Sequence, residues 1–194
     1  MDMVKRVKRV AVADLCGTFY DSRRQLVKVE NLVLAHYGKP PITEDRYMQV
    51  FSMASRDALR EFYASVGVPR DKLDEAEKLF RVWWNELPPP PLIPGAKEAF
   101  ERLDEGHGKN VYVVTNEVRE MVEKRFERDG LERYLSRAHS SPPGGKAAVL
   151  FEIAQAHPDA IVAFVGDTVS DGRECLRARE MGSQNLRFVG ILHP

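Results

Sequence analysis

The first residue that could do chemistry is Asp14, which follows the apolar run Val10-Ala11-Val12-Ala13. A short continuous run of this kind is typical of a strand buried on both faces. A carboxylate at the carboxyl end of such a strand lies where open α/β sheets bind their ligands. Aspartate also opens many turns, and Gly17 follows closely, so this stretch alone indicates either a reactive carboxylate or an ordinary turn.

Polar residues follow two more apolar runs, and a lysine begins the helical pattern between those runs. They are Thr115 and Asn116 after 111–114, Lys146, and Asp167 with Asp171 after 160–165. Three carboxylates close together cannot all stay ionised without a cation among them, and hard oxygen ligands favour Mg²⁺. A hydroxyl, an amide and an ammonium can hold the oxygens of a phosphoryl group, and a carboxylate can attack phosphorus to form an aspartyl phosphate.

Strands alternate with helical patterns over most of the chain, and this order predicts where the polar residues lie. We expect strands at 7–13, 111–114, 160–165 and 186–192. Such alternation is the signature of an α/β fold, so we predict a Rossmann-like, doubly wound parallel sheet. Because crossover connections are right-handed, the strand ends that carry Asp14, Thr115 and Asp167 should share one edge of the sheet.

One long block of the chain has helical patterns and no strand. The patterns occupy 22–37, 43–51, 56–66 and 71–87, before a proline run at 88–91. We interpret residues 21–87 as an inserted α-helical cap domain, and residues 1–20 and 88–194 as the α/β core domain. Trp83 and Trp84 have the spacing of a buried helix face, which favours core packing over a ligand cleft.

Composition limits the partners that we expect. Of 194 residues, 43% are hydrophobic and 30% are charged, and the formal net charge is zero. This balance is typical of a globular domain without a basic field for nucleic acid or anionic lipid. No segment has the pattern of a signal peptide or a membrane span, and two cysteines, Cys16 and Cys175, cannot build a disulfide framework. We therefore expect a cytoplasmic monomer or homodimer that binds neither nucleic acid nor membrane.

The order of the motifs resembles that of the haloacid dehalogenase-like (HAD) hydrolase superfamily, in the helical-cap branch with phosphoglycolate phosphatase and β-phosphoglucomutase. The family pattern is Asp-x-Asp-Gly-Thr, then a strand ending in Thr or Ser, then a lysine, then Gly-Asp-x-x-x-Asp. The matching segments are Asp14-Leu15-Cys16-Gly17-Thr18, Val113-Val114-Thr115-Asn116, Lys146 and Gly166-Asp167-Thr168-Val169-Ser170-Asp171. The resemblance covers nearly the whole chain.

The resemblance implies a metal site as well as a fold. It implies a Rossmann-like core with an inserted helical cap. It also implies a Mg²⁺ ion bound by Asp14, Asp167 and the backbone carbonyl of Cys16, with support from Asp171.

The resemblance further implies a catalytic role for Asp14, which would be the nucleophile, while Thr115 and Lys146 would hold the phosphoryl oxygens. The substrate would be a small phosphorylated metabolite. Additional substrate contacts are expected from Gly17, Thr18, Asn116 and Arg56. Arg56 lies in the cap and could bind an anionic part of the substrate, although a surface arginine explains it equally well.

One position departs from the family pattern, because Cys16 stands where the phosphatases have their second aspartate. That aspartate protonates the leaving alkoxide and then deprotonates the attacking water. A thiol with a reference pKa of about 8.5 is a poor substitute, and losing a positioned acid and base costs roughly 10²- to 10⁴-fold in rate. We expect a phosphatase that is slow on alkyl phosphates or tuned to good leaving groups.

The cysteine leaves other functions open. Asp167 and Asp171 argue against a dehalogenase, which has little use for Mg²⁺. A phosphotransferase that exploits the missing acid, or a catalytically impaired protein that binds a phosphorylated ligand, remains an alternative. A nucleophilic thiol would need an activating neighbour, and no histidine has an evident place beside Cys16.

A phosphonatase is the remaining enzymatic alternative. It needs a cap lysine near the nucleophile, whereas the cap segment 52–57 contains Arg56 and no lysine. Lys28 and Lys39 elsewhere in the cap keep this alternative open.

Overall fold

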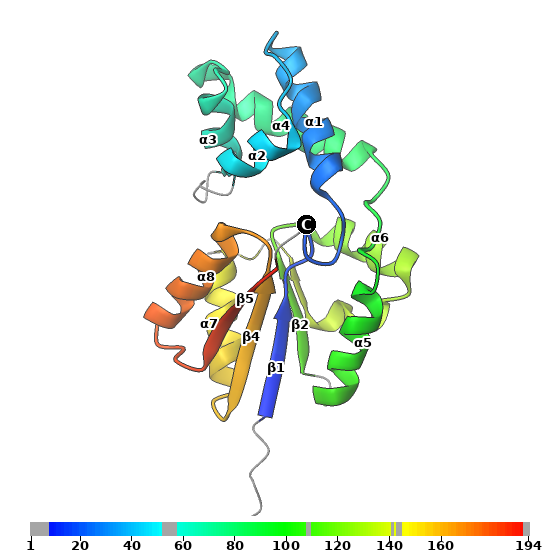
Figure 1. Cartoon of the computed structure of the whole chain (residues 1–194), viewed down its shortest axis with the longest axis vertical. Coiled ribbons are helices and arrows are strands. Elements are labelled where there is room, and N and C mark those ends of the chain that lie inside the picture. The colour runs from blue at the N-terminus through cyan, green and yellow to red at the C-terminus, as the bar shows by residue number, and fades with distance from the viewer. Residues whose placement is uncertain (1–7, 52–57, 108–109, 141, 143–144, 192–194) are drawn as a thin grey trace, which may run out of the picture. The chain divides into compact units, whose positions relative to one another are not determined.

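The chain folds into two compact units, seen in a computed structural model that describes residues 8–51, 58–107, 110–140, 142 and 145–191 (Figure 1). One unit contains residues 1–20 and 92–194, and the other contains residues 21–91. The first unit is an α/β domain and the second is helical, so we describe each by itself.

Among the described residues, a parallel sheet of five strands forms the centre of the α/β unit. The strands are β1 (Lys8–Ala13), β2 (Val111–Thr115), β3 (Ala138–Ser140), β4 (Ala160–Gly166) and β5 (Leu186–Gly190), in the spatial order β3-β2-β1-β4-β5. All neighbouring pairs are parallel, which confirms the predicted Rossmann-like fold. The sequence prediction missed β3, because a strand of three residues carries no measurable alternation.

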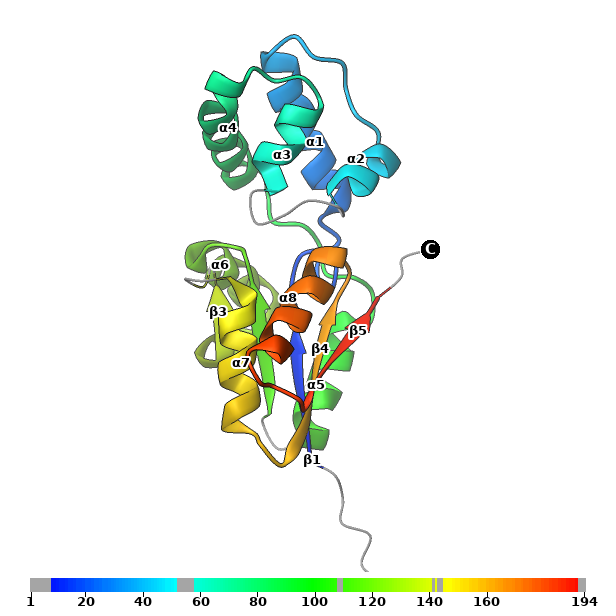
Figure 2. The ribbon, with the colours of Figure 1, turned by 90° about the vertical axis from the view of Figure 1, so that its left-hand side faces the viewer.

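Helices cover both faces of this sheet (Figures 1 and 2). They are α5 (Ala96–His107), α6 (Arg119–Asp129), α7 (Lys146–Ala156) and α8 (Val169–Glu180), with a 3₁₀ turn, η2 (Glu132–Arg137). On one face, Leu150 of α7 and Ala178 of α8 pack against Phe164 of β4. On the other face, Phe100 of α5 and Phe126 of α6 join a second core. Both layers bury apolar surface, which is the main term that stabilises such a domain.

In its described residues, the helical unit has four α-helices around its own core. They are α1 (Arg23–His36), α2 (Glu44–Phe51), α3 (Ala58–Ser65) and α4 (Leu73–Glu86), with a 3₁₀ turn, η1 (Arg70–Lys72), before α4. Trp84 is buried in this core and Trp83 packs against it, so the prediction that the tryptophans are core residues is confirmed. In the described part of the chain, no helix has both the length and the apolar character that crossing a bilayer requires.

One carboxyl group lies inside the helical unit. Glu30 of α1 has no exposed surface and neighbours the buried residues Val29 and Val33. Burial raises the pKa of Glu30 to about 8, and the nearby Tyr63 hydroxyl lowers it in part. The group is therefore protonated in the folded protein at neutral pH, although it ionises in the unfolded chain near its ordinary value of 4.5.

We expect the stability of the helical unit to fall as the pH rises from about 4.5 to about 8. Over this window the folded state binds one proton more than the unfolded state, so the stability is full below the window and constant above it. The total loss is on the order of 5 kcal/mol. Glu30→Gln should remove this pH dependence. Urea unfolding followed by tryptophan fluorescence measures it, since both tryptophans, Trp83 and Trp84, lie in this unit. A wild type and a variant with equal slopes against pH would contradict the prediction.

Candidate active site

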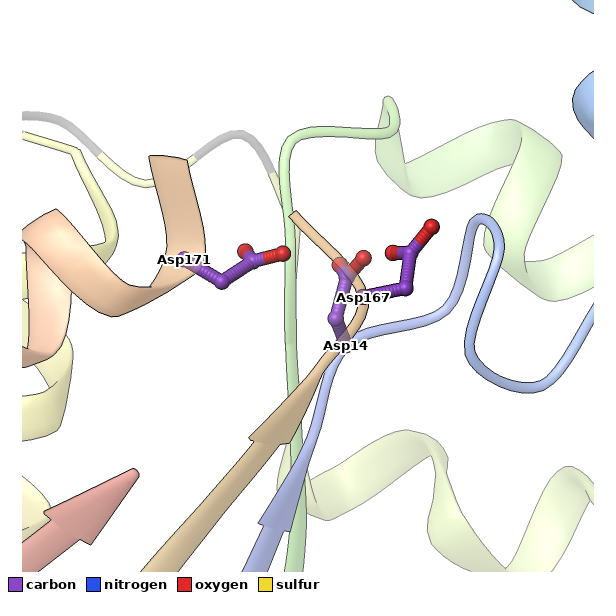
Figure 3. A group of neighbouring side chains, drawn as sticks. All are labelled: Asp14, Asp167 and Asp171. Atoms are coloured by element: carbon purple, nitrogen blue, oxygen red, sulfur yellow. The ribbon is translucent and has the colours of Figure 1, made fainter. Parts of the chain in front are cut away.

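Three aspartates meet at the carboxyl edge of the sheet (Figure 3). Asp14 follows β1, Asp167 follows β4 and Asp171 lies in the first turn of α8. Because β1 and β4 are parallel neighbours, their carboxyl ends lie together, and the helix that follows β4 begins beside them. One carboxylate oxygen from each aspartate lies within 4.8 Å of the others. These residues therefore have the spacing and the hard oxygen donors of a site for a divalent cation.

A lysine bridges two of these carboxylates. The Nζ atom of Lys146 donates to Oδ1 of Asp14 and to Oδ1 of Asp171, each at 2.7 Å. All three side chains are almost completely buried. Burial acts to lower the pKa of Lys146, but the two carboxylates raise it above its ordinary value, so the ammonium stays charged.

Three carboxylates and one lysine make up this cluster. Burial raises the pKa of Asp14 to about 7, Lys146 lowers it, and Asp171 and Asp167 raise it further. One ammonium thus faces three carboxylates, and Asp14 titrates near neutrality. A cation among the carboxylates would favour the ionised form of Asp14, so the donor set fits a metal ion on grounds of charge as well as spacing.

Capping interactions stabilise the first turns of α7 and α8, the helices that carry Lys146 and Asp171. The Thr168 hydroxyl accepts from the Asp171 backbone N–H at 3.1 Å, and Oδ2 of Asp171 accepts from the Thr168 backbone at 3.2 Å, which forms a capping box at the start of α8. Oε2 of Glu174 accepts from the backbone N–H of Ala147 at 2.9 Å and so caps the first turn of α7. Lys146 and Asp171 are therefore fixed by the ends of their helices.

The turn after Asp14 brings Gly17 and Thr18 to the same cluster. The Thr18 hydroxyl donates to Oδ1 of Asp167 at 3.4 Å. Gly17 has φ +78°, and a Cβ atom there would overlap the carboxylate of Asp167. Glycine is required for the left-handed backbone and for the close approach of this carboxylate.

We expect Gly17→Ala to weaken Mg²⁺ binding by at least about tenfold, because Asp167 must move away from the added methyl group. Gly95→Ala is the matched control. Gly95 has φ +81°, which imposes similar backbone strain, but nothing lies within 4 Å of its added Cβ. Calorimetric titration with Mg²⁺ measures both variants. Equal affinities in the two variants would contradict the prediction.

The remaining predicted substrate contacts have different positions. Thr115 is buried at the end of β2, and its hydroxyl accepts from the Glu117 backbone N–H at 3.2 Å. Asn116 is exposed in the loop that follows. Arg56 lies outside the described residues, so its predicted contact stays a prediction.

The side chain of Cys16 lies beside charged groups that the sequence analysis did not predict. Its thiol donates to Oε2 of Glu117 over 3.8 Å and accepts from Nη1 of Arg125 at 3.5 Å. Burial raises the pKa of the thiol to about 12; Arg125 lowers it, whereas Glu117 and Asp14 raise it. The thiol is therefore protonated at neutral pH, which argues against a nucleophilic cysteine.

The sequence contains a weak signal for Arg125. It occupies a helix position in register with Met121 and Val122, which are buried, so a charge stands where periodicity predicts an apolar residue. Glu117 has no such signal, because it follows the predicted Thr115-Asn116 pair in a loop.

A comparison with protein families identifies the chain. A family model of haloacid dehalogenase-like hydrolases matches residues 8–178. The chain belongs to the haloacid dehalogenase-like hydrolase family. This confirms the resemblance drawn from the four motifs, and the chain is accordingly a hydrolase. No curated protein matches it in sequence.

Solved structures support the fold assignment of this hydrolase. A haloacid dehalogenase-like family protein from Streptococcus pneumoniae has a TM-score of 0.75 at 20% identity, over 96% of this chain and 85% of that one. A protein from Haemophilus somnus, described as a predicted phosphoglycolate phosphatase, has a TM-score of 0.72 at 20% identity, over 96% and 86%. A subfamily IA hydrolase from Geobacter sulfurreducens has a TM-score of 0.58 at 19% identity, over 95% and 86%. At these identities the likeness shows the fold alone.

Proposed function

We propose that this hydrolase is a Mg²⁺-dependent phosphatase that acts on a small phosphorylated metabolite through an aspartyl phosphate on Asp14. The observation that carries the proposal is the buried cluster of Asp14, Lys146, Asp167 and Asp171 at the carboxyl edge of the sheet. The negative carboxylates suit a metal ion, and the positive ammonium of Lys146 suits a phosphoryl group. The phosphoglycolate phosphatase description of one structural relative agrees with this substrate class.

The residues that would hold Mg²⁺ are Asp14, Asp167 and the backbone carbonyl of Cys16, with Asp171 in support. When bound, the ion supplies positive charge that offsets the repulsion between the Asp14 carboxylate and the phosphoryl oxygens. The raised pKa of Asp14, about 7 without a metal, makes this charge important, because only the ionised carboxylate is a nucleophile.

The chain's own groups define the first step. Lys146 binds Oδ1 of Asp14 at 2.7 Å, which leaves Oδ2 for attack on phosphorus. A bond forms between Oδ2 and phosphorus while the bond from phosphorus to the leaving oxygen breaks. Thr115 and Lys146 would bind the phosphoryl oxygens and stabilise the charge that they carry in the transition state. Water then attacks phosphorus and releases phosphate and the Asp14 carboxylate.

The leaving group must depart without a strong acid at position 16. The Cys16 thiol, with its pKa raised to about 12, is a weak proton donor and is not a base at neutral pH. We infer that the enzyme favours substrates whose leaving oxygen is stable as an anion, such as aryl esters, over alkyl phosphates.

The test is phosphate release from a matched pair of aryl and alkyl phosphates, with and without Mg²⁺. We expect release only with Mg²⁺, at a rate for the aryl ester about 10²-fold or more above that for the alkyl ester. Release that persists in a chelator would contradict the metal requirement, and equal rates for the two esters would contradict the role given to position 16.

The protonated thiol also favours a second candidate, a catalytically impaired member of the family that binds a phosphorylated ligand. This protein would bind inorganic phosphate in the presence of Mg²⁺ and release none from either ester. Calorimetry with phosphate, beside the release assay, distinguishes the two functions.

A further inference from the structure

A buried ion pair lies beside the proposed phosphoryl site, in the α/β unit. Nη2 of Arg125 donates to Oε2 of Glu117 at 2.7 Å, and the two side chains are 0% and 8% exposed. Arg125 comes from α6, whereas Glu117 comes from the loop that joins β2 to α6. The pair is therefore shielded from water. In such a buried position its geometry is held much more tightly than that of a surface pair.

Arg125 contacts both ends of the loop that follows Asp14. At one end, its Nη1 atom donates to the Cys16 thiol at 3.5 Å. At the other end, its guanidinium lies 5.3 Å from the centre of the Tyr20 ring. The loop closes on itself, because the Gly17 backbone N–H donates to the Tyr20 carbonyl at 2.9 Å. One buried side chain thus contacts both ends of the turn that carries Gly17.

Glu117 belongs to the second loop of the site, the one that follows β2. Its backbone N–H donates to the Thr115 hydroxyl at 3.2 Å, and its carboxylate binds Arg125. The Cys16 thiol, 3.8 Å from the same carboxylate, completes a closed set of contacts. The loop after β1 and the loop after β2 are therefore joined through charged groups and not only through apolar packing.

The use of charges here has a cost that an apolar pair would not have. Apolar side chains of similar volume often stabilise a core as well as a buried ion pair does. The neighbouring position Phe126 on α6 is such a core residue. An ion pair adds directionality, because the planar guanidinium donates hydrogen bonds only to partners at certain positions.

We propose that the Glu117–Arg125 pair is a positioning element that fixes the Cys16 loop against the Thr115 loop, and with them two sides of the phosphoryl site. The coupling between the loops is a property of the chain itself. Only the consequence for turnover rests on the proposed phosphatase function.

The experiment compares Arg125→Lys, Glu117→Gln and the double variant Arg125→Met/Glu117→Gln with a control pair. Arg125→Lys keeps the positive charge but loses the planar guanidinium group. The double variant removes both charges. Neither of these two variants therefore leaves a buried charge without its partner. The control is Arg137→Met/Asp104→Asn. Arg137 also makes a 2.7 Å ion pair, with Asp104, and also lies 5.3 Å from a tyrosine ring.

Hydrogen exchange without any ligand is the first readout. We expect amide exchange to rise by about tenfold in peptides covering 14–20 and 115–117 together, in each variant of the pair that folds. The control should leave both peptides at the wild-type rate. A rise in the amide exchange rate confined to one of the two loops would overturn the proposal. So would a folded variant of the Glu117–Arg125 pair in which both loops exchange at the wild-type rate.

Steady-state kinetics on an aryl phosphate is the second readout. A positioning role predicts a fall in kcat of about 100-fold with a smaller change in KM, whereas a purely structural role changes the folded fraction and leaves kcat per folded molecule unchanged. If the wild type releases no phosphate at all, the proposed function fails, and hydrogen exchange still decides whether the two loops are coupled.

Discussion

Asp14→Asn is expected to reduce phosphate release by roughly 10⁴-fold or more, because the amide retains the shape of the side chain but cannot attack phosphorus. The amide oxygen can still accept from Lys146, whose ammonium also keeps its partner Asp171 at 2.7 Å. The fold should therefore survive. The measurement is phosphate release from an aryl ester in saturating Mg²⁺, together with trapping of the phosphoenzyme in acid, which hydroxylamine should cleave in the wild type.

Asp159→Asn is the matched control for this substitution. Asp159 is exposed immediately before β4, whereas Asp14 follows the carboxyl end of the neighbouring strand β1. The substitution Asp159→Asn removes one carboxylate from the same unit without changing a residue of the site. An Asp14→Asn variant that keeps more than about a tenth of the wild-type rate would show that Asp14 is not the nucleophile.

Cys16→Asp is expected to raise the turnover of alkyl phosphates by about 10²- to 10⁴-fold and to change aryl turnover little. A carboxyl group at this position can protonate a poor leaving group, which the thiol, with its pKa raised to about 12, does badly. The ratio of aryl to alkyl kcat/KM measures the effect and is insensitive to the fraction of folded enzyme.

The surroundings of residue 16 make a control necessary. An aspartate there would lie beside both Arg125 and Glu117, which contact the thiol in this protein. The asparagine of Cys16→Asn has nearly the size and polarity of the aspartate but cannot transfer the proton. Cys16→Asn should therefore leave the ratio of aryl to alkyl kcat/KM unchanged. An equal gain in both variants would mean that packing, and not proton transfer, limits alkyl phosphates. No gain in Cys16→Asp with intact aryl turnover would reject the inference about the leaving group.

The sequence by itself determined the fold class and the family. Both depend on local patterns: a buried strand reads as an apolar run, and each motif follows such a run or begins a helix. Parallel strands place their carboxyl ends at one edge, so Asp14 and Asp167 could be assigned to one site without knowing any distance. Gly17 could be assigned in the same way, since its motif is contiguous with Asp14.

Only the tertiary structure decided which groups surround Cys16. Arg125 is 109 residues from Cys16, and its contact depends on the rotation of α6 about its own axis, which sequence spacing does not specify. The same reason hides the cap that Glu174 provides for Ala147, 27 residues away. It also hides Glu30, because a carboxyl group inside an amphipathic pattern is expected on the polar face. Local periodicity determines which elements form, whereas the direction of each side chain between packed elements is settled only when those elements pack.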